Sequence, residues 1–210
     1  MNRTAVSESI GLPGTIDNDL SYTDASIGFD TALNTALYAI SNIRDTSAAH
    51  ERATIIEVMG RECGDIAVYA GLTGGAEIIL VPEEPVDLTE VCRTIVESRN
   101  KGKRSCIIVK AEGVDIDAGT LDEEITKRTG LDVKVVILGY IQRGGTPTAQ
   151  DRMLASIFGS KAVELLKEGI HGVAVGIEGG EIIYPELGDA LSRKKRTPTH
   201  LYNLAKTLSL

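Results

Sequence analysis

Apolar runs alternate with amphipathic segments along most of the chain. Four runs with an apolar centre and no two-residue alternation are expected to form buried strands: 53–59, 77–82, 105–113 and 132–140. Apolar residues recur at helical spacing in four other segments: 24–43, 87–102, 120–130 and 148–169. Strands without two-residue alternation, separated by helices, predict an α/β fold with a doubly wound, mostly parallel sheet covered on both faces.

The ends of the expected helices carry recognisable signals. Asp24 is a plausible N-cap for the first helix, and Thr120 with Glu123 forms a capping box for the third, which closes on Gly130. A short strand and a turn are expected within 172–187, and the tail from Pro198 has a helical pattern.

Polar residues gather where the expected strands end. The segment GRECG follows 53–59, AEG follows 105–111 and QRGG follows 132–140. A strand around 5–12 would place PGTIDND in the same position. Because ligands of such sheets bind at the carboxyl ends of the strands, these segments are expected to form one site.

The residues of these segments suit phosphate chemistry. Asp17 and Asp19 lie two positions apart, so both can face one ligand, accept a hydroxyl proton or hold a metal; the alternative is an Asx-rich turn. Arg61 and Arg143 adjoin glycines, which let backbone approach a ligand; the alternative is a surface arginine in a tight turn. Glu112 is a further candidate or a turn-capping carboxylate. A base beside several cations favours phosphoryl transfer.

Composition excludes several other classes. The chain has 210 residues and a net charge of −8, which opposes a nucleic acid or an anionic membrane as partner. No apolar run approaches the roughly 18 residues of a membrane helix, and the start MNRTAVSES has no apolar core typical of a secretory signal. Three scattered cysteines fit a reducing, cytoplasmic setting. Neither a P-loop nor a GxGxxG motif occurs.

The segments PGTIDND, EVMGRECGD, LGYIQRGGTP and DRMLAS, in this order, resemble the ATP-dependent 6-phosphofructokinases. The resemblance runs from about Ile10 to the C-terminus. It implies a glycolytic phosphotransferase that moves the ATP γ-phosphate to the 1-hydroxyl of fructose 6-phosphate, with Mg²⁺, giving fructose 1,6-bisphosphate. It also implies an allosteric, cytoplasmic homotetramer.

The resemblance assigns roles residue by residue. Asp17 is the expected base, Asp19 supports the metal, Thr15 contacts the transferring phosphate and Arg61 stabilises transition-state charge. The residues expected to bind the sugar phosphate are Arg52, Met59, Gly60, Glu112, Lys134, Tyr140 and Arg143, with Arg52 donated by a neighbouring subunit.

An effector site for ADP or phosphoenolpyruvate is also implied by the resemblance. Its expected residues are Arg44, Gly75, Glu77, Lys101, Lys103 and Arg104. From the sequence alone, a basic helix end is the stronger interpretation of NKGKR.

At a few positions, the residue in this chain bears on its expected affinity or on its phosphoryl donor. Lys134 and Tyr140 stand where the family usually has Arg and His, which predicts weaker sugar-phosphate binding. Ser105 replaces a polar or basic group near the effector residues. Gly14 favours ATP, because pyrophosphate-dependent relatives usually carry Lys there.

The resemblance also implies a phosphofructokinase-like two-domain architecture that is incomplete at the N-terminus. Residues 1–28 and 141–192 are expected to be a remnant of the ATP-binding domain, including the catalytic loop, and 29–140 with 193–210 the sugar-phosphate domain. The glycine-rich ATP-binding segment expected before PGTIDND is absent from the sequence. Two alternatives stay open: a non-catalytic sugar-phosphate or effector-binding fragment, and a pyrophosphate-dependent phosphofructokinase.

Overall fold

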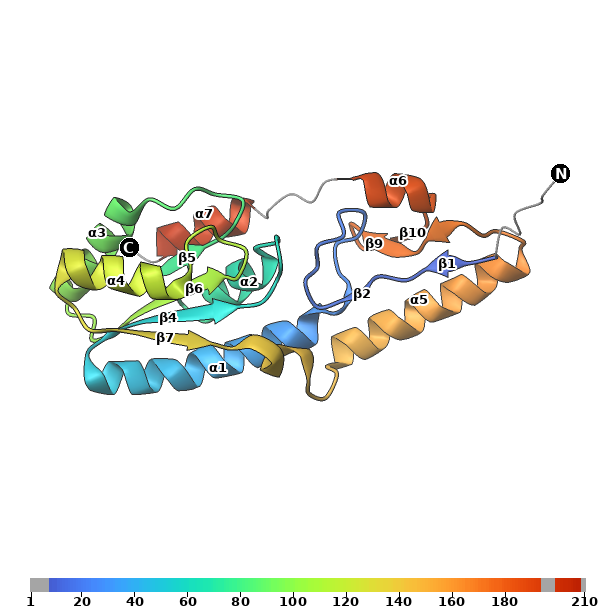
Figure 1. Ribbon diagram of the computed structural model, residues 1–210. Coiled ribbons are helices and arrows are strands. Elements are labelled where there is room, and N and C mark those ends of the chain that lie inside the picture. Colours follow the sequence, from blue (N-terminus) through green and yellow to red (C-terminus); the bar gives the residue numbers. More distant parts are fainter. Residues whose placement is uncertain (1–7, 194–198, 209–210) are drawn as a thin grey trace. The chain divides into compact units, whose positions relative to one another are not determined.

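The computed structural model describes residues 8–193 and 199–208, which form two compact units (Figure 1). The first unit comprises the described residues within Met1–Asp30 and Pro147–Lys195. The second comprises those within Thr31–Thr146 and Arg196–Leu210. Residues 5–7 of the expected first strand, and Pro198 at the start of the expected last helix, lie outside the described residues.

The second unit is built on a four-stranded parallel sheet in the order β5-β6-β4-β7. Its strands are β4 (Ala53–Val58), β5 (Ile78–Leu80), β6 (Cys106–Ala111) and β7 (Val133–Ile137). All four coincide with predicted apolar runs, although each is shorter than its run. The prediction of a mostly parallel sheet is therefore confirmed.

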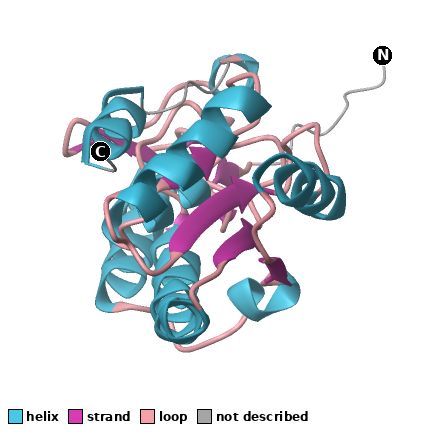
Figure 2. Ribbon diagram, turned by 90° about the vertical axis from the view of Figure 1, so that its left-hand side faces the viewer, coloured by secondary structure: helices cyan, strands magenta, loops and turns pink. Residues whose placement is uncertain are grey.

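Helices cover this sheet on both faces (Figure 2). They are α1 (Phe29–His50), α2 (Asp65–Thr73), α3 (Leu88–Asn100), α4 (Ala118–Thr129) and α7 (Thr199–Leu208). The connection through α2 runs toward β5 and that through α4 toward β7, the opposite edge. Because such crossovers are right-handed, α2 and α4 lie on opposite faces. This explains why all six residues of β6 are buried.

The first unit contains short strands and two helices. Three strand pairs occur among its described residues: β1 (Ile10–Gly11) with β8 (Val173–Ala174), β2 (Gly14–Thr15) with β3 (Ile27–Gly28), and β9 (Gly176–Glu178) with β10 (Glu181–Ile183). The helices are α5 (Ala149–Lys167) and α6 (Leu187–Ser192). Phe158 of α5 is fully buried in a cluster with Leu154, Leu165, Val173 and Val175.

Two predicted helix starts are wrong. The first helix begins at Phe29, because β3 pairs with β2 and keeps the chain extended through Gly28; the Asp24 carboxylate instead accepts a hydrogen bond from Gly179 N–H at 2.7 Å. The helix α4 begins at Ala118, and its cap is Asp117, which accepts from the backbone N–H groups of Gly119 and Thr120. The predicted end at Gly130 is confirmed, with φ at 70°.

Candidate functional site

The loop that follows β2 carries the two candidate carboxylates. Thr15 Oγ1 accepts a hydrogen bond from Asp17 N–H at 3.1 Å, and the chain then turns through Asn18 with φ at 52°. The Asn18 side chain fixes the turn, since Oδ1 accepts from Ser26 N–H at 3.0 Å and Nδ2 donates to the Asp24 carbonyl at 3.2 Å. The loop therefore has a defined shape.

The two carboxylates of this loop have different surroundings. Asp17 is 4% exposed, whereas Asp19 is exposed to solvent. A buried carboxylate is held in one orientation by its surroundings, and an exposed one can take part in binding a hydrated ion. Mg²⁺ in phosphoryl-transfer sites is typically held by one or two carboxylates together with substrate phosphates, so Asp19 fits such a role.

Asp151 supports this loop from α5. Its Oδ1 accepts a hydrogen bond from Gly28 N–H at 2.8 Å, and the side chain is 3% exposed. Gly28 lies opposite Thr15 in the β2–β3 pair. Asp151 therefore fixes the strand against which Thr15 pairs, a role that the sequence motif DRMLAS did not reveal.

A second group of candidate residues lies at the carboxyl ends of β4 and β6, in the second unit. Three consecutive backbone N–H groups there are held by side chains from other elements. Met59 N–H donates to Gln142 Oε1 at 2.9 Å. Gly60 N–H and Arg61 N–H both donate to Glu112 Oε1, at 3.2 and 2.8 Å. Residues 59–61, which we call the MGR loop, are thus clamped between Glu112 and Gln142.

The backbone of the MGR loop requires its glycine. Gly60 has φ at 142°, and a Cβ there would lie 2.5 Å from the Cys63 carbonyl oxygen. Arg61 also has a positive φ, 52°, which is uncommon for a residue other than glycine. Strained residues of this kind are often found at functional sites. Arg61 is exposed, so its guanidinium is accessible from solvent.

Gln142 is the residue of this group that the sequence analysis missed. It lies in the short helix η1 (Gly139–Arg143), is 1% exposed, and its Nε2 has no hydrogen-bond partner. Glu112, by contrast, was expected to contact the sugar, and the structure shows that one of its oxygens holds backbone. Through Oε1, Glu112 therefore acts as the turn-capping carboxylate that was the alternative interpretation.

We expect Gln142→Leu to loosen the MGR loop. The variant leaves Met59 N–H buried without an acceptor, which costs about 1–3 kcal/mol. Chemical denaturation should show the loss in free energy of unfolding. The comparison variant is Ile141→Ala, at a 63% exposed position of the same short helix, which should change the free energy of unfolding by no more than about 0.5 kcal/mol. Equal stability of wild type and Gln142→Leu would contradict a positioning role.

The remaining sugar-phosphate candidates lie at two ends of the sheet. Arg143 stacks over the Tyr140 ring, 4.8 Å from its centroid, in η1 beyond the carboxyl end of β7. Lys134 and Arg52 lie at the amino ends of β7 and β4 and both approach Asp132, at 3.1 and 3.8 Å. Six residues of strand correspond to about 17 Å. The structure therefore does not bring Arg52 and Lys134 together with the MGR loop within one chain.

Four of the six candidate effector residues make contacts near the amino ends of β5 and β6, which we call the effector network. Arg44 Nη2 donates to the Gly75 carbonyl at 2.7 Å and to that of Gly74. Glu77 is buried; its Oε2 accepts from Ile107 N–H at 2.8 Å, and Lys103 Nζ lies 3.5 Å from its Oε1.

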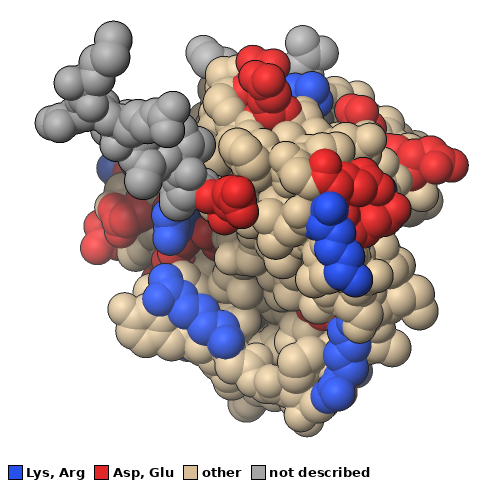
Figure 3. Space-filling model, turned by 90° about the vertical axis from the view of Figure 1, so that its right-hand side faces the viewer, with Lys and Arg blue, Asp and Glu red and all other residues tan. Residues whose placement is uncertain are grey.

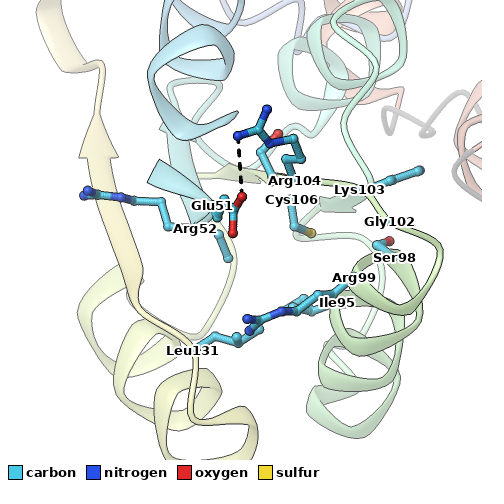
Figure 4. Close-up of a pocket in the computed structure, with 12 residues that line it drawn as sticks. Glu51, Arg52, Ile95, Ser98, Arg99, Gly102, Lys103, Arg104, Cys106 and Leu131 are labelled. Atoms are coloured by element: carbon cyan, nitrogen blue, oxygen red, sulfur yellow. Dashed lines mark ion pairs between the residues drawn. The ribbon is translucent and has the colours of Figure 1, made fainter. Parts of the chain in front are cut away.

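A pocket of about 250 Å³ opens beside this network (Figure 4). Its polar lining includes Glu51, Arg52, Arg99, Lys103 and Arg104, so that four cations accompany one carboxylate. Arg104 and Glu51 face each other with 3.5 Å between Nη2 and Oε1. Burial raises the pKa of Cys106, also in the lining, to about 12, so its thiol stays protonated. Of the predicted effector residues, Lys103 and Arg104 line this pocket.

On the face shown in Figure 3, the basic side chains are separated from one another by acidic and neutral residues. Among the described residues, no group of three or more His, Cys, Asp or Glu side chains is arranged to hold a metal ion. Within residues 8–193 and 199–208, none of the helices combines the length and apolar character that a membrane span requires.

Comparison with known proteins identifies the family. Residues 2–166 match the family model described as phosphofructokinase. The chain belongs to the phosphofructokinase family. The expectation from the sequence motifs is thereby confirmed.

Curated members of the phosphofructokinase family align over nearly the whole chain. The ATP-dependent 6-phosphofructokinase of Clostridioides difficile is 53% identical over 202 residues, which are 96% of this chain and 63% of the relative. ATP-dependent 6-phosphofructokinase 1 of Clostridium perfringens is 52% identical with the same coverage. The chain thus spans 63% of the length of these relatives.

Solved phosphofructokinase structures share the fold. The Saccharomyces cerevisiae enzyme superposes with a TM-score of 0.84 at 32% identity, covering 96% of this chain and 27% of that one. A pyrophosphate-dependent phosphofructokinase from Marinobacter aquaeolei gives 0.78 at 28% identity, covering 92% of this chain and 55% of that one.

Proposed function

We propose that this chain carries the catalytic loop and the sugar-phosphate site of an ATP-dependent 6-phosphofructokinase, which transfers the ATP γ-phosphate to the 1-hydroxyl of fructose 6-phosphate. The observation that carries the proposal is the MGR loop, whose three N–H groups are clamped by Glu112 and Gln142 at the carboxyl edge of the sheet. This clamp fixes the backbone of a cation, Arg61, where ligands of parallel sheets bind.

Each candidate residue has a role in this proposal. Asp17 accepts the proton of the 1-hydroxyl, and Thr15 contacts the transferring phosphate. Arg61 faces the negative charge of the transferring group, which is stabilised mainly by positioning and electrostatics in phosphoryl transfer. Mg²⁺, when bound, supplies further positive charge at the phosphate oxygens, with Asp19 as a ligand. Met59, Gly60 and Glu112 bind the fructose, and Tyr140 and Arg143 its phosphate.

We assign the first unit to the ATP-binding domain and the second to the sugar-phosphate domain. Arg52 and Lys134, at the amino ends of their strands, would serve the site of a neighbouring subunit in a cytoplasmic homotetramer. The network around Arg44, Gly75 and Glu77, with Lys101, Lys103 and Arg104, would bind ADP or phosphoenolpyruvate. Its cations suit two phosphates or a carboxylate with a phosphate.

The donor in this proposal is ATP rather than pyrophosphate. Curated relatives with about half of their residues identical are named ATP-dependent, whereas the pyrophosphate-dependent structure is 28% identical. Gly14 is exposed, and a Cβ placed there would meet nothing within 4 Å, so the space beside it is open for a nucleotide.

Titration calorimetry of the 210-residue chain with fructose 6-phosphate tests the proposal. We expect saturable binding that is lost in the Asp17→Ala, Arg143→Ala double variant, because it lacks both the proposed base and a proposed ligand of the sugar phosphate. Met153→Ala, at an exposed position, is the control. Titrations with ATP and with pyrophosphate compare the donors. A chain that is folded by circular dichroism but does not bind the sugar phosphate would favour an inherited, non-working fragment.

A further inference from the structure

Lys110 is a buried charge in the middle of the sheet. It is buried in β6, and its Nζ donates to Glu57 Oε2 at 2.9 Å and to the Ala111 carbonyl at 3.2 Å. Glu57 is the residue directly opposite in β4. Its side chain keeps 18% exposure, while that of Lys110 keeps 1%. The functional roles assigned above use neither residue.

Stability alone does not account for such a pair. Removing a charge from water is expensive, and a buried ion pair can often be replaced by apolar side chains of similar volume without loss of stability. The neighbours of Lys110 in β6 are apolar at every position from Cys106 to Val109. An apolar side chain at position 110 would therefore continue the pattern of the strand. We therefore looked for a role of the Lys110–Glu57 pair in positioning nearby backbone.

The pair lies near the carboxyl ends of β4 and β6, just before the segments that form the candidate sugar site. One further residue pair, Val58 with Ala111, follows it, and the pairing of β4 with β6 ends there. The next residues are the MGR loop on one side and Glu112 on the other. Glu112 N–H donates to the Val58 carbonyl at 2.9 Å. The Glu57 carbonyl accepts from Leu138 N–H at 3.0 Å, immediately before η1.

We propose that Lys110 is a positioning residue for Arg61. Its ion pair with Glu57 joins the ends of β4 and β6 in the alignment that lets Glu112 Oε1 accept from both Gly60 N–H and Arg61 N–H. The same contact holds β4 at the point where Leu138 and then Gln142 approach the loop. The importance of Arg61 for phosphoryl transfer rests on the proposed function, whereas the positioning itself concerns the free protein.

The experiment replaces the pair by neutral side chains of similar size, Lys110→Met with Glu57→Gln. Amide hydrogen exchange of Gly60 and Arg61 is measured by NMR, with Ile108 in the centre of β6 as internal reference. We expect exchange at Gly60 and Arg61 to be at least tenfold faster than in wild type, with Ile108 unchanged. The control is Lys127→Met, which removes an exposed lysine paired with Glu124 at 3.9 Å and should leave all three amides unchanged.

Two results would overturn the proposal. One is unchanged protection of Gly60 and Arg61, and the other is a loss of protection that is equal at Ile108, because the pair would then only stabilise the sheet. Should the double variant not fold, Lys110→Met alone is measured in the same way, since the partly exposed Glu57 carboxylate can then reach water. Titration with fructose 6-phosphate is a separate measurement, which tests the proposed function and not the positioning. Absence of binding in wild type would refute the proposed function, while the exchange data would still decide the positioning.

Discussion

Gly113→Ala is expected to displace the MGR loop and to weaken binding of fructose 6-phosphate at least tenfold. A Cβ at position 113 would lie 2.1 Å from the Arg61 carbonyl oxygen and 3.2 Å from the Glu62 Cα. Both atoms belong to the backbone, so no side-chain rotation relieves the clash, and the loop must move away from Glu112. Overpacking of this kind costs about 1–3 kcal/mol in the free energy of unfolding. Urea denaturation and calorimetric titration measure the two effects.

The comparison variant for Gly113→Ala is Gly159→Ala. Gly159 lies within α5, and a Cβ there would meet nothing within 4 Å. Alanine in a helix interior is favoured over glycine by about 0.5–1 kcal/mol, so this variant should be slightly more stable than wild type. Wild-type sugar affinity in Gly113→Ala would show that the loop adapts to the added methyl group and that its observed backbone is not needed for binding.

The parallel sheet could be predicted because the signal for it is local. The runs that became β4 and β6 are apolar at successive positions, and strands buried on both faces need that pattern. The position of Arg61 and Glu112 at the carboxyl edge followed from the order of strands and helices alone. The helix α2 escaped prediction for a related reason: six of its nine residues are buried, so it shows no polar face at helical spacing.

The contacts that Gln142, Asp151 and Lys110 make in support of the candidate site could not be predicted, because each joins residues far apart in sequence. Gln142 and Met59 are 83 positions apart, and Asp151 and Gly28 are 123 apart. Lys110 is the charged residue of an apolar run, and its partner depends on the alignment of β4 with β6. The wrong N-cap at Asp24 has the same origin, since the pairing of β3 with β2 decides where the helix begins.

The supporting contacts in the two units are of the same kind. In each unit, a side chain from another element holds backbone at, or paired with, a segment that carries residues proposed to meet substrate. Asp151 does this next to Thr15, and Glu112 and Gln142 do it for the MGR loop. Phosphoryl transfer depends on positioned charges more than on covalent chemistry by the protein. We therefore expect substitution of these supporting side chains to impair phosphoryl transfer as much as substitution of the proposed catalytic groups.

Phe158→Ala is expected to unfold the first unit while the second keeps its structure. Phe158 is fully buried in the small cluster formed with Leu165 and Val175, and truncation of a buried phenylalanine costs about 3–5 kcal/mol. That is a large share of the roughly 5–15 kcal/mol that stabilises a typical domain. Amide hydrogen exchange at Val175, in the first unit, and Ile108, in the second, measures the outcome. We expect protection to be lost at the first position and kept at the second.

The control for Phe158→Ala is Met153→Ala in the same helix, where the side chain is 60% exposed and the expected change is within about 0.5 kcal/mol. Selective loss of protection in the first unit would show that the second unit keeps its fold without the first. Asp17 and Thr15 would lose their fixed loop, whereas the MGR loop, clamped within the second unit, would persist. Residual binding of fructose 6-phosphate by the Phe158→Ala chain would then measure what the second unit contributes by itself. Simultaneous loss of protection at both amides would instead show that the two units unfold as one cooperative structure.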